Sequence, residues 1–379
     1  MKRTVYLDCA ASCPLDPRVL DRMIAAGAGN PGSRTHEYGL RARKIVEHAR
    51  DQVASVTACR RSEVIFTSGA TESNNLAILG LIDHGQRSGR RHIVTTQIEH
   101  PAVREPMDEM ERRGFRVTRI APRPGGWVDA GEVLAAVGEE TMLVSVMHVN
   151  NETGVVQPIG QIAEGLAGSQ ALLHVDAAQS FGKLIAPLRH PRIDTISASA
   201  HKIMGPQGIG ALIVRRGAPL RPMMFGGGQE RGLRPGTLPA HLIAGFGLAA
   251  ELAVTEEAAR LGVAREYQAK LIDGLAPLAP RIHGDLDRTS PYMVNMAFDG
   301  FDSEEVIDAW APLAAVSNGS ACASAEPQCS YVLSAMGLKP RHAAGAIRLS
   351  WCPLTPPADW PAMVDALQSS AMEAHGRSA

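Results

Sequence analysis

The sequence predicts an α/β protein built on a mostly parallel sheet, with a smaller α+β domain in its C-terminal part. Seven short β-rich runs recur between residues 64 and 215, with helical stretches or turns between them. Such alternation favours a parallel sheet with helices on both faces. The 379 residues, 45% of them hydrophobic, are enough for two domains or for one large unit with an appendage.

The expected elements of the large unit follow in chain order. Apolar residues near helical spacing predict an amphipathic helix over 38–56. The seven strands are expected at 64–67, 92–96, 115–120, 142–149, 172–175, 194–199 and 210–215. Helices are expected between them, for example at 102–113 and 129–137.

A second unit is expected after the glycine-rich run 225–231. One long helix is predicted from Leu238 to about Gly262, and the pattern then restarts. The later segments are predicted as strands at 291–298 and 346–350 and a loop of small residues at 317–327. The domains that we predict are a large one at 15–255 and a small one made of 1–14 and 256–379.

Composition excludes several classes of partner. Lys and Arg number 38 against 39 Asp and Glu, for a net charge of −1, so no global field attracts nucleic acid or an anionic membrane. No apolar stretch approaches the roughly 18 residues of a membrane span, and we expect a cytoplasmic protein. Six cysteines are too sparse for a disulfide framework. Cys9 and Cys13 lack a second close Cys/His pair, so we expect core packing and no metal.

Lys202 is the most informative residue of the chain. A lysine amine attacks carbonyls only where its surroundings help it to lose a proton, and a strand end of small residues beside His201 favours this. Upstream, Asp176 follows a short apolar run, where a carboxylate can pair with a pyridinium nitrogen. The two residues together point to pyridoxal phosphate as cofactor.

A phosphate cradle is expected in the segment 63–75, which reads as a strand, a tight turn at Gly69 and a helix. Backbone N–H groups at a helix start attract anions, and the Thr71 hydroxyl either caps this helix or bonds a phosphate oxygen. This turn, Asp176 and Lys202 all lie at or just after strand ends, where ligands bind in parallel sheets. The three features are therefore expected to converge.

Cys322 is a candidate reactive thiol. It stands in a loop of Ser, Ala and Gly, with neither bulk around it nor a disulfide partner to explain it. No Lys or Arg lies beside it in the sequence, so any lowering of its pKa must come from contacts in space.

An ordered series of motifs over nearly the whole length resembles the cysteine desulfurases of the class V, fold-type I pyridoxal-phosphate family. The likeness is greatest to desulfurases of iron–sulfur cluster assembly and extends to those of bacterial DNA phosphorothioation. The matching motifs lie at 7–8, 29–31, 34–39, 66–74, 98–103, 147–154, 174–179, 199–202, 227–231, 234–239 and 319–322. The resemblance implies a fold-type I transferase with a seven-stranded, mostly parallel sheet, acting as a homodimer on L-cysteine and delivering sulfur to an acceptor protein.

The resemblance also implies roles for individual residues. Lys202 would bind the cofactor aldehyde and carry the proton at the substrate Cα. His100 would stack on the ring and assist proton transfer, and Cys322 would take the substrate sulfur as a persulfide. The implied cofactor-binding residues are Ala70, Thr71, Asn151, Asp176, Gln179, Ser199, His201 and, across a dimer interface, Thr237. Arg348 would grip the substrate carboxylate, with Asn151 close to the substrate as well.

Alternatives stay open at this point. His100 is otherwise a simple helix-start histidine before Pro101, and Arg348 a surface ion pair. Cys329 either resolves the persulfide into a disulfide or is a spectator, and we expect a spectator. A selenocysteine lyase, an aminotransferase and a non-catalytic scaffold of the same fold are competing functions. The acceptor is an iron–sulfur scaffold, a tRNA-thiolation relay or a DNA-phosphorothioation enzyme, and no direct contact with nucleic acid or membrane is expected.

Three departures from the family pattern are visible. Gln207 stands where relatives usually carry a lysine, Pro235 where a serine is common, and Cys352-Pro353 where a Gly-Arg pair is usual. We expect the last change to reshape the mouth of the substrate site.

Overall fold

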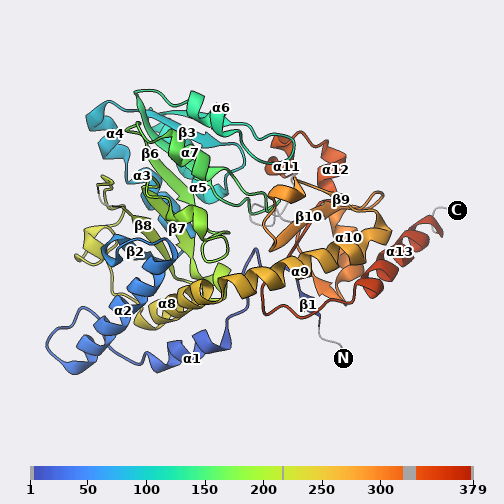
Figure 1. The fold of residues 1–379 in the computed structure, drawn as a ribbon, viewed down its shortest axis with the longest axis horizontal. Coiled ribbons are helices and arrows are strands. Elements are labelled where there is room, and N and C mark those ends of the chain that lie inside the picture. Colours follow the sequence, from blue (N-terminus) through green and yellow to red (C-terminus); the bar gives the residue numbers. More distant parts are fainter. Residues whose placement is uncertain (1–3, 216, 319–329, 377–379) are drawn as a thin grey trace.

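The computed structural model describes residues 4–215, 217–318 and 330–376 and contains a seven-stranded sheet with helices around it (Figure 1). The strand order is β2-β8-β7-β6-β5-β3-β4. The strands are β2 (Val64–Thr67), β3 (His92–Thr96), β4 (Arg116–Ile120), β5 (Thr141–Met147), β6 (Leu172–Asp176), β7 (Thr195–Ser199) and β8 (Gly210–Val214). All pairs are parallel except those of β8, which runs opposite to β2 and β7. The seven predicted strands and the mostly parallel sheet are confirmed.

Most strands of the sheet are rich in β-branched residues and are covered on both faces. Every residue of β3, β5, β7 and β8 is buried, whereas the edge strand β4 is only partly covered. Parallel strands covered on both faces read as continuous hydrophobic runs, which is why the sequence revealed them. The helices of this part are α1 (Pro17–Ala25), α2 (Glu37–Val56), α3 (Ala70–Leu79), α4 (Ile82–Ser88), α5 (Pro101–Arg112), α6 (Ala130–Ala135), α7 (Ile159–Gly165) and α8 (Ala240–Thr255).

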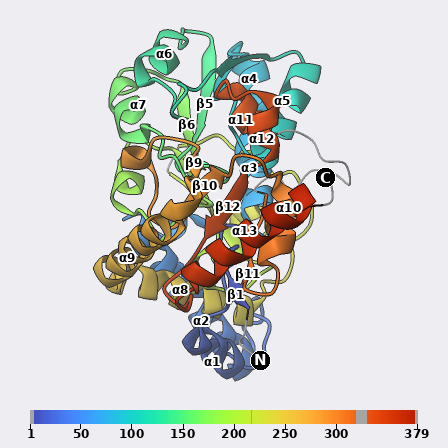
Figure 2. The same cartoon turned by 90° about the vertical axis from the view of Figure 1, so that its right-hand side faces the viewer.

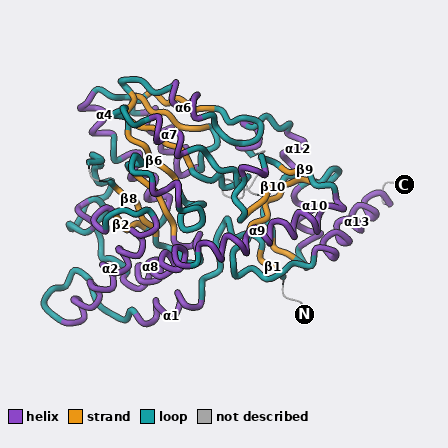
Figure 3. The backbone as a smooth tube through the Cα atoms, in the orientation of Figure 1, coloured by secondary structure: helices purple, strands orange, loops and turns teal. Residues whose placement is uncertain are grey.

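A second group of strands lies apart from the large sheet (Figure 3). It consists of a parallel pair, β1 (Val5–Tyr6) with β11 (Ala314–Ala315), and an antiparallel sheet ordered β12 (Ile347–Ser350), β10 (Met293–Ala297) and β9 (Arg281–Ile282). The helices of this part are α9 (Glu257–Leu275), α10 (Ser303–Trp310), α11 (Tyr331–Ala335), α12 (Pro340–Ala344) and α13 (Trp360–Gly376). Its core contains Leu7, Leu271, Trp310 and Trp351.

The start of the chain thus packs with its last third. In Figure 2, β1 lies beside β11 and close to β12, and Asp8 continues the contact as a bridge to Ser350. This arrangement agrees with the domain division that we predict, but that division remains a prediction. No helix in the described ranges is both long and apolar enough to cross a bilayer.

The single helix predicted from Leu238 to about Gly262 is wrong. The structure has two helices, and α8 ends at Thr255, whose hydroxyl donates to the Glu251 carbonyl at 3.0 Å. Such back-bonding competes with the helical ladder and bends it. Gly262 does not end a helix, because it lies on the exposed face of α9, where glycine costs only about 1 kcal/mol.

Candidate active site

The predicted site residues meet at the ends of β2, β6 and β7. Asp176 is the last residue of β6, and Lys202 lies in the 3₁₀ turn Ala200–Ile203 that follows β7. Asp176 pairs in register with Ser197 of β7, so the two strand ends are neighbours. The helix after β2 begins beside them, since a side chain built at Gly69 would stand 3.7 Å from the Ser199 hydroxyl. The convergence expected from the sequence is therefore present in the fold.

Asp176 is held by a buried network that the sequence did not reveal. The Asn74 amide donates to Asp176 Oδ2 at 2.8 Å, and the Ala178 N–H donates to Oδ1 at 2.9 Å. Asn74 Oδ1 lies 3.0 Å from His174 Nε2, and His174 Nδ1 lies 2.9 Å from the Thr195 hydroxyl. Burial lowers the pKa of His174 to about 4, so the ring is neutral. Because the Asn74 oxygen can only accept, the ring proton belongs on Nε2 and Nδ1 accepts from Thr195.

Two backbone carbonyls hold the amine of Lys202. Lys202 Nζ donates to the Ala10 oxygen at 2.5 Å and to the Ala11 oxygen at 2.9 Å. The Gln179 amide donates to the same Ala10 oxygen at 2.8 Å. The turn that contains Ala10 and Ala11 therefore forms one wall around Lys202, although it lies about 190 residues away in the sequence.

The N-terminus of α3 is free of a side-chain cap. Its N-cap residue is Gly69, which has no side chain to cap with, so the capping role considered for Thr71 is excluded. Across from it, His201 Nδ1 lies 3.2 Å from the Ser12 hydroxyl, which also accepts from Gln207 at 3.1 Å. Burial, with the neighbouring charge of Lys202, lowers the pKa of His201 to about 4, so this imidazole is neutral. In the tautomer whose Nδ1 accepts from Ser12, the ring N–H is on Nε2 and can donate to an anion.

His100 is the N-cap of α5, and its Nδ1 accepts from the Ala102 N–H at 3.1 Å. His100 therefore starts a helix and also lies close to the charged residues of the site, so the two roles considered for it do not exclude each other. Burial lowers the pKa of His100, the Asp176 carboxylate opposes that shift, and Lys202 and Arg348 add to it. A neutral ring whose Nδ1 accepts carries its proton on Nε2.

Arg348 in β12 is buried rather than part of a surface ion pair. Its guanidinium donates to Asp8 Oδ1 at 2.7 Å and to the Asn151 carbonyl at 2.7 Å. Only 6% of the arginine side chain is exposed, against 20% for Asp8. The Arg348 Nε–H has no partner among the described residues. The guanidinium is therefore fixed by two partners and keeps its Nε–H as a free donor for an anion.

Two of the predicted residues lie outside this assembly. Thr237 is exposed, and it lines a separate cavity of about 360 Å³ with Arg50 and Glu230. It makes no hydrogen bond to the other candidate residues within the described ranges, and its role across a dimer interface remains a prediction. Cys322 and Cys329 lie in 319–329, outside the described residues.

Three of the buried polar atoms without a partner belong to predicted site residues and fit pyridoxal phosphate with its substrate. Within the described ranges, Gln179 Oε1 and Asn151 Oδ1 are buried without a partner, beside the Arg348 Nε–H noted above. Buried polar atoms are rarely left unpaired, so these atoms indicate a ligand. An acceptor at Gln179, a carboxylate at Asp176, an amine at Lys202 and uncapped N–H groups at α3 suit the hydroxyl, ring nitrogen, aldehyde and phosphate of this cofactor. The fold and site thus define a pyridoxal-phosphate enzyme of fold type I.

Comparisons with known proteins agree with this class. The pattern of the aminotransferase class-V family matches residues 5–359. The cysteine desulfurase IscS of Vibrio cholerae is 45% identical over 359 residues, which are 93% of this chain and 88% of the relative. A solved NifS-like protein superposes with a TM-score of 0.88 at 35% identity, covering 98% of this chain and 100% of that one. DndA from Streptomyces lividans superposes with a TM-score of 0.80 at 44% identity, covering 92% and 99%.

The chain belongs to the class-V aminotransferase family, among its cysteine desulfurases. It is a pyridoxal-phosphate-dependent cysteine desulfurase. The fold and the cofactor expected from the sequence are confirmed.

Sequence reasoning missed Asn74, His174 and Asp8 as parts of the site. A signal existed for His174, since it lies two residues before Asp176 on the same strand and therefore on the same face. Asn74 lies one helical turn after the phosphate turn, which placed it near the site but did not indicate its partner. Nothing local indicated that Asp8 pairs with Arg348, because 340 residues separate them.

Proposed function

We propose that this enzyme converts L-cysteine to L-alanine by way of a persulfide on Cys322 and passes the sulfur to an acceptor protein. The family supplies the activity. The observation that supports the residue roles is that Asp176 and Lys202 lie at neighbouring strand ends, and that His100 is close enough to feel the charges of Asp176, Lys202 and Arg348.

In the proposed site, Arg348 binds the carboxylate of L-cysteine through its free N–H groups, and Asn151 Oδ1 accepts from the substrate amine. Pyridoxal phosphate, when bound, supplies an electron sink that makes the substrate Cα–H acidic and the C–S bond labile. Lys202 moves the proton at Cα, and its amine is released from the Ala10 and Ala11 carbonyls as it does so. Asp176, fixed by Asn74, holds the ring nitrogen.

Cys322, as thiolate, then attacks the substrate sulfur. A sulfur–sulfur bond forms while the substrate Cβ–S bond breaks, and the Cβ carbon takes up a proton, for which the Nε2–H of His100 is the candidate donor. Cysteine and a thiol thus become alanine and a persulfide, with atoms and electrons balanced and no external oxidant. Gln179 bonds the ring hydroxyl, and Ala70, Thr71, Ser199 and His201 bind the phosphate. A homodimer, with Thr237 reaching the partner's phosphate, belongs to the same proposal.

The test is the mass of the protein after turnover. Purified enzyme with pyridoxal phosphate is incubated with L-cysteine in the absence of reductant, and the intact mass is read for one added sulfur. We expect the addition in wild type and in the matched control Cys329→Ser, and its loss in Cys322→Ala. One added sulfur on Cys322→Ala would contradict the assignment, as would full release of alanine and sulfide by that variant.

A further inference from the structure

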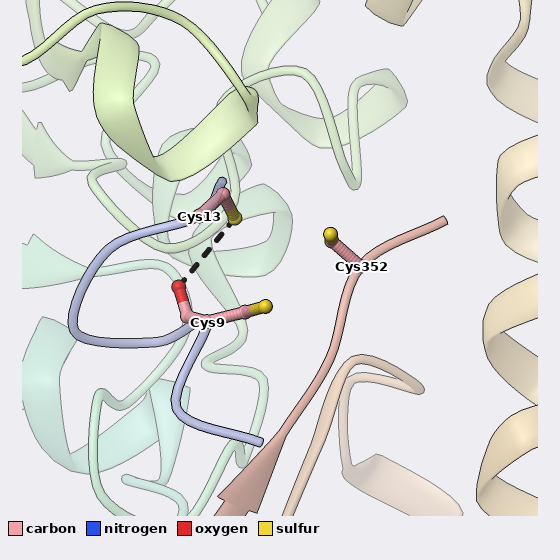
Figure 4. A group of neighbouring side chains, drawn as sticks. All are labelled: Cys9, Cys13 and Cys352. Carbon is pink, nitrogen blue, oxygen red and sulfur yellow. Dashed lines mark hydrogen bonds between the residues drawn. The ribbon is translucent and has the colours of Figure 1, made fainter. Parts of the chain in front are cut away.

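Three buried cysteines form a cluster that the reaction does not use. Cys9 and Cys13 lie in the segment that follows β1, and Cys352 lies just after β12. Their exposed fractions are 0%, 7% and 3%, and all three thiols are free. Their sulfur atoms lie within 4.8 Å of one another, and Figure 4 shows the three side chains facing one shared space. Cys9 and Cys13, expected only to pack in the core, therefore have a third partner that the sequence did not reveal.

Separate elements fix each of the three residues. The Cys9 N–H donates to the Ser350 carbonyl at 3.2 Å, and the Cys13 N–H donates to the His201 carbonyl at 2.9 Å. The Cys352 N–H donates to the Thr355 hydroxyl at 3.0 Å. The three sulfurs thus converge from anchored backbone, as the donors of a preformed site must.

The spacing of the sulfurs fits a metal–thiolate site. With a metal–sulfur bond of about 2.3 Å, three ligands in a plane around one ion lie about 4.0 Å apart. The sulfur–sulfur distances in the structure are at most 4.8 Å, which is less than about 1 Å longer than this separation. Small rotations of the side chains would bring the sulfur atoms to the shorter distance. Thiolates are soft donors and select Cu(I), zinc or iron–sulfur clusters.

The number of donors favours Cu(I) over zinc. Structural zinc is almost always four-coordinate, and the cluster offers three thiols with no His, Asp or Glu in the group among the described residues. The cavity beside Cys13 and Cys352 has a volume of about 10 Å³, the lower limit for one water molecule as a fourth ligand. The side chain of Met204, whose thioether is also soft, packs in the same cluster.

The surroundings of the cluster suit a negatively charged complex. Three thiolates on one monovalent ion carry a net charge of −2, and Lys183 lines the same cavity, as does Arg260, which pairs with Glu256. Lys183 is 6% exposed, and within the described ranges no carboxylate forms an ion pair with it. A buried cation without a carboxylate partner stabilises thiolates that lie beside it.

We propose that Cys9, Cys13 and Cys352 form a buried three-thiolate site for Cu(I). Each thiol that becomes a ligand releases one proton, and the oxidation states do not change. The turn that contains Cys9 and Cys13 also supplies the Ala10 and Ala11 carbonyls to Lys202, so a bound ion would stiffen the wall of the active site.

The test is anaerobic titration of the holoenzyme with Cu(I) in competition with bathocuproine disulfonate, a coloured Cu(I) chelator. We expect one equivalent to be retained by wild type and by the controls Cys59→Ser and Cys322→Ser/Cys329→Ser. Each of Cys9→Ser, Cys13→Ser and Cys352→Ser should weaken binding by more than about 100-fold, because loss of a group that only hydrogen-bonds to a metal ligand already costs about 10–100-fold. X-ray absorption at the copper edge should report a shell of sulfur only.

Folding of each variant is checked by circular dichroism and by cofactor absorbance, and the alanine variant of the same cysteine replaces any serine variant that does not fold. Binding unchanged in all three cluster variants would overturn the proposal. So would binding that disappears in Cys322→Ser/Cys329→Ser, because it would place the ion on the loop. Absence of binding under reductant, with loss of two thiols in air, would assign the cluster to disulfide formation instead.

Discussion

The hydrogen bonds of Asn74 lead to a prediction that distinguishes their contribution from that of side-chain packing. Asn74 is fully buried and links the Asp176 carboxylate to the His174 ring at 2.8 and 3.0 Å. Asn74→Ala removes a hydrogen bond to a charged group and leaves the His174 Nε2–H without an acceptor. These losses cost about 1.5–3 and about 1–3 kcal/mol, so we expect the variant to be less stable by about 2.5–6 kcal/mol.

Asn75 provides the matched control. It lies next to Asn74 on α3, and its amide makes only an exposed hydrogen bond to the Thr71 carbonyl at 3.0 Å. Asn75→Ala gains the same helix propensity as Asn74→Ala and should stay within about 0.5 kcal/mol of wild type. Urea unfolding of the apoprotein, followed by circular dichroism, measures both. We also expect Asn74→Ala to bind pyridoxal phosphate at least about tenfold more weakly, which is about 1.4 kcal/mol. Equal midpoints and equal cofactor affinities for the two variants would refute the reasoning.

Three further predictions concern the neighbouring groups. Arg348→Lys should lower kcat/KM for L-cysteine by about 10–100-fold, since the planar guanidinium that binds the substrate carboxylate is lost. The control Arg341→Lys, at an exposed position, should leave kcat/KM unchanged. Equal kinetics of the two variants would show that Arg348 does not bind the carboxylate. Burial raises the pKa of Glu152 to about 7 from 4.5, so its contribution to stability is complete below pH 4.5 and is lost as pH rises through about 7. Glu152→Gln, compared with exposed Glu105→Gln in thermal melts, should therefore gain up to about 3 kcal/mol over wild type across that window, and a constant difference would count against it. Gln179→Leu should weaken cofactor binding up to about tenfold in equilibrium dialysis, and unchanged affinity would remove Gln179 from the site.

The sequence predicted the sheet well because its signal is local. Strands buried on both faces need continuous apolar runs, and such runs are visible without knowledge of their neighbours. The same holds for Lys202 and Asp176, which stand directly after two of these runs. The helix break at Thr255 was missed because no Gly or Pro marks it in the sequence, whereas Gly262 carried the stronger local signal.

Contacts between distant segments left no signal of that kind. The Asp8–Arg348 pair joins residues 340 apart, and the Asn74–Asp176 bond joins residues 102 apart. The cysteine cluster likewise needs β1 and β12 to lie together before its third sulfur has any relation to the first two. Contacts between side chains far apart in the sequence depend on the assembled fold, and the spacing of apolar residues along the chain does not predict them.

The contact between the start and the last third of the chain has a consequence for biosynthesis. The Ala10 and Ala11 carbonyls hold the Lys202 amine, and the adjacent Asp8 is held by Arg348 and Ser350. A ribosome that adds roughly 5–20 residues per second needs about 17–70 s to make the 340 residues between Asp8 and Arg348. During that interval the large sheet can form while the wall around Lys202 is still missing. A nascent chain would thus present a reactive lysine to cellular aldehydes before its cofactor site is complete.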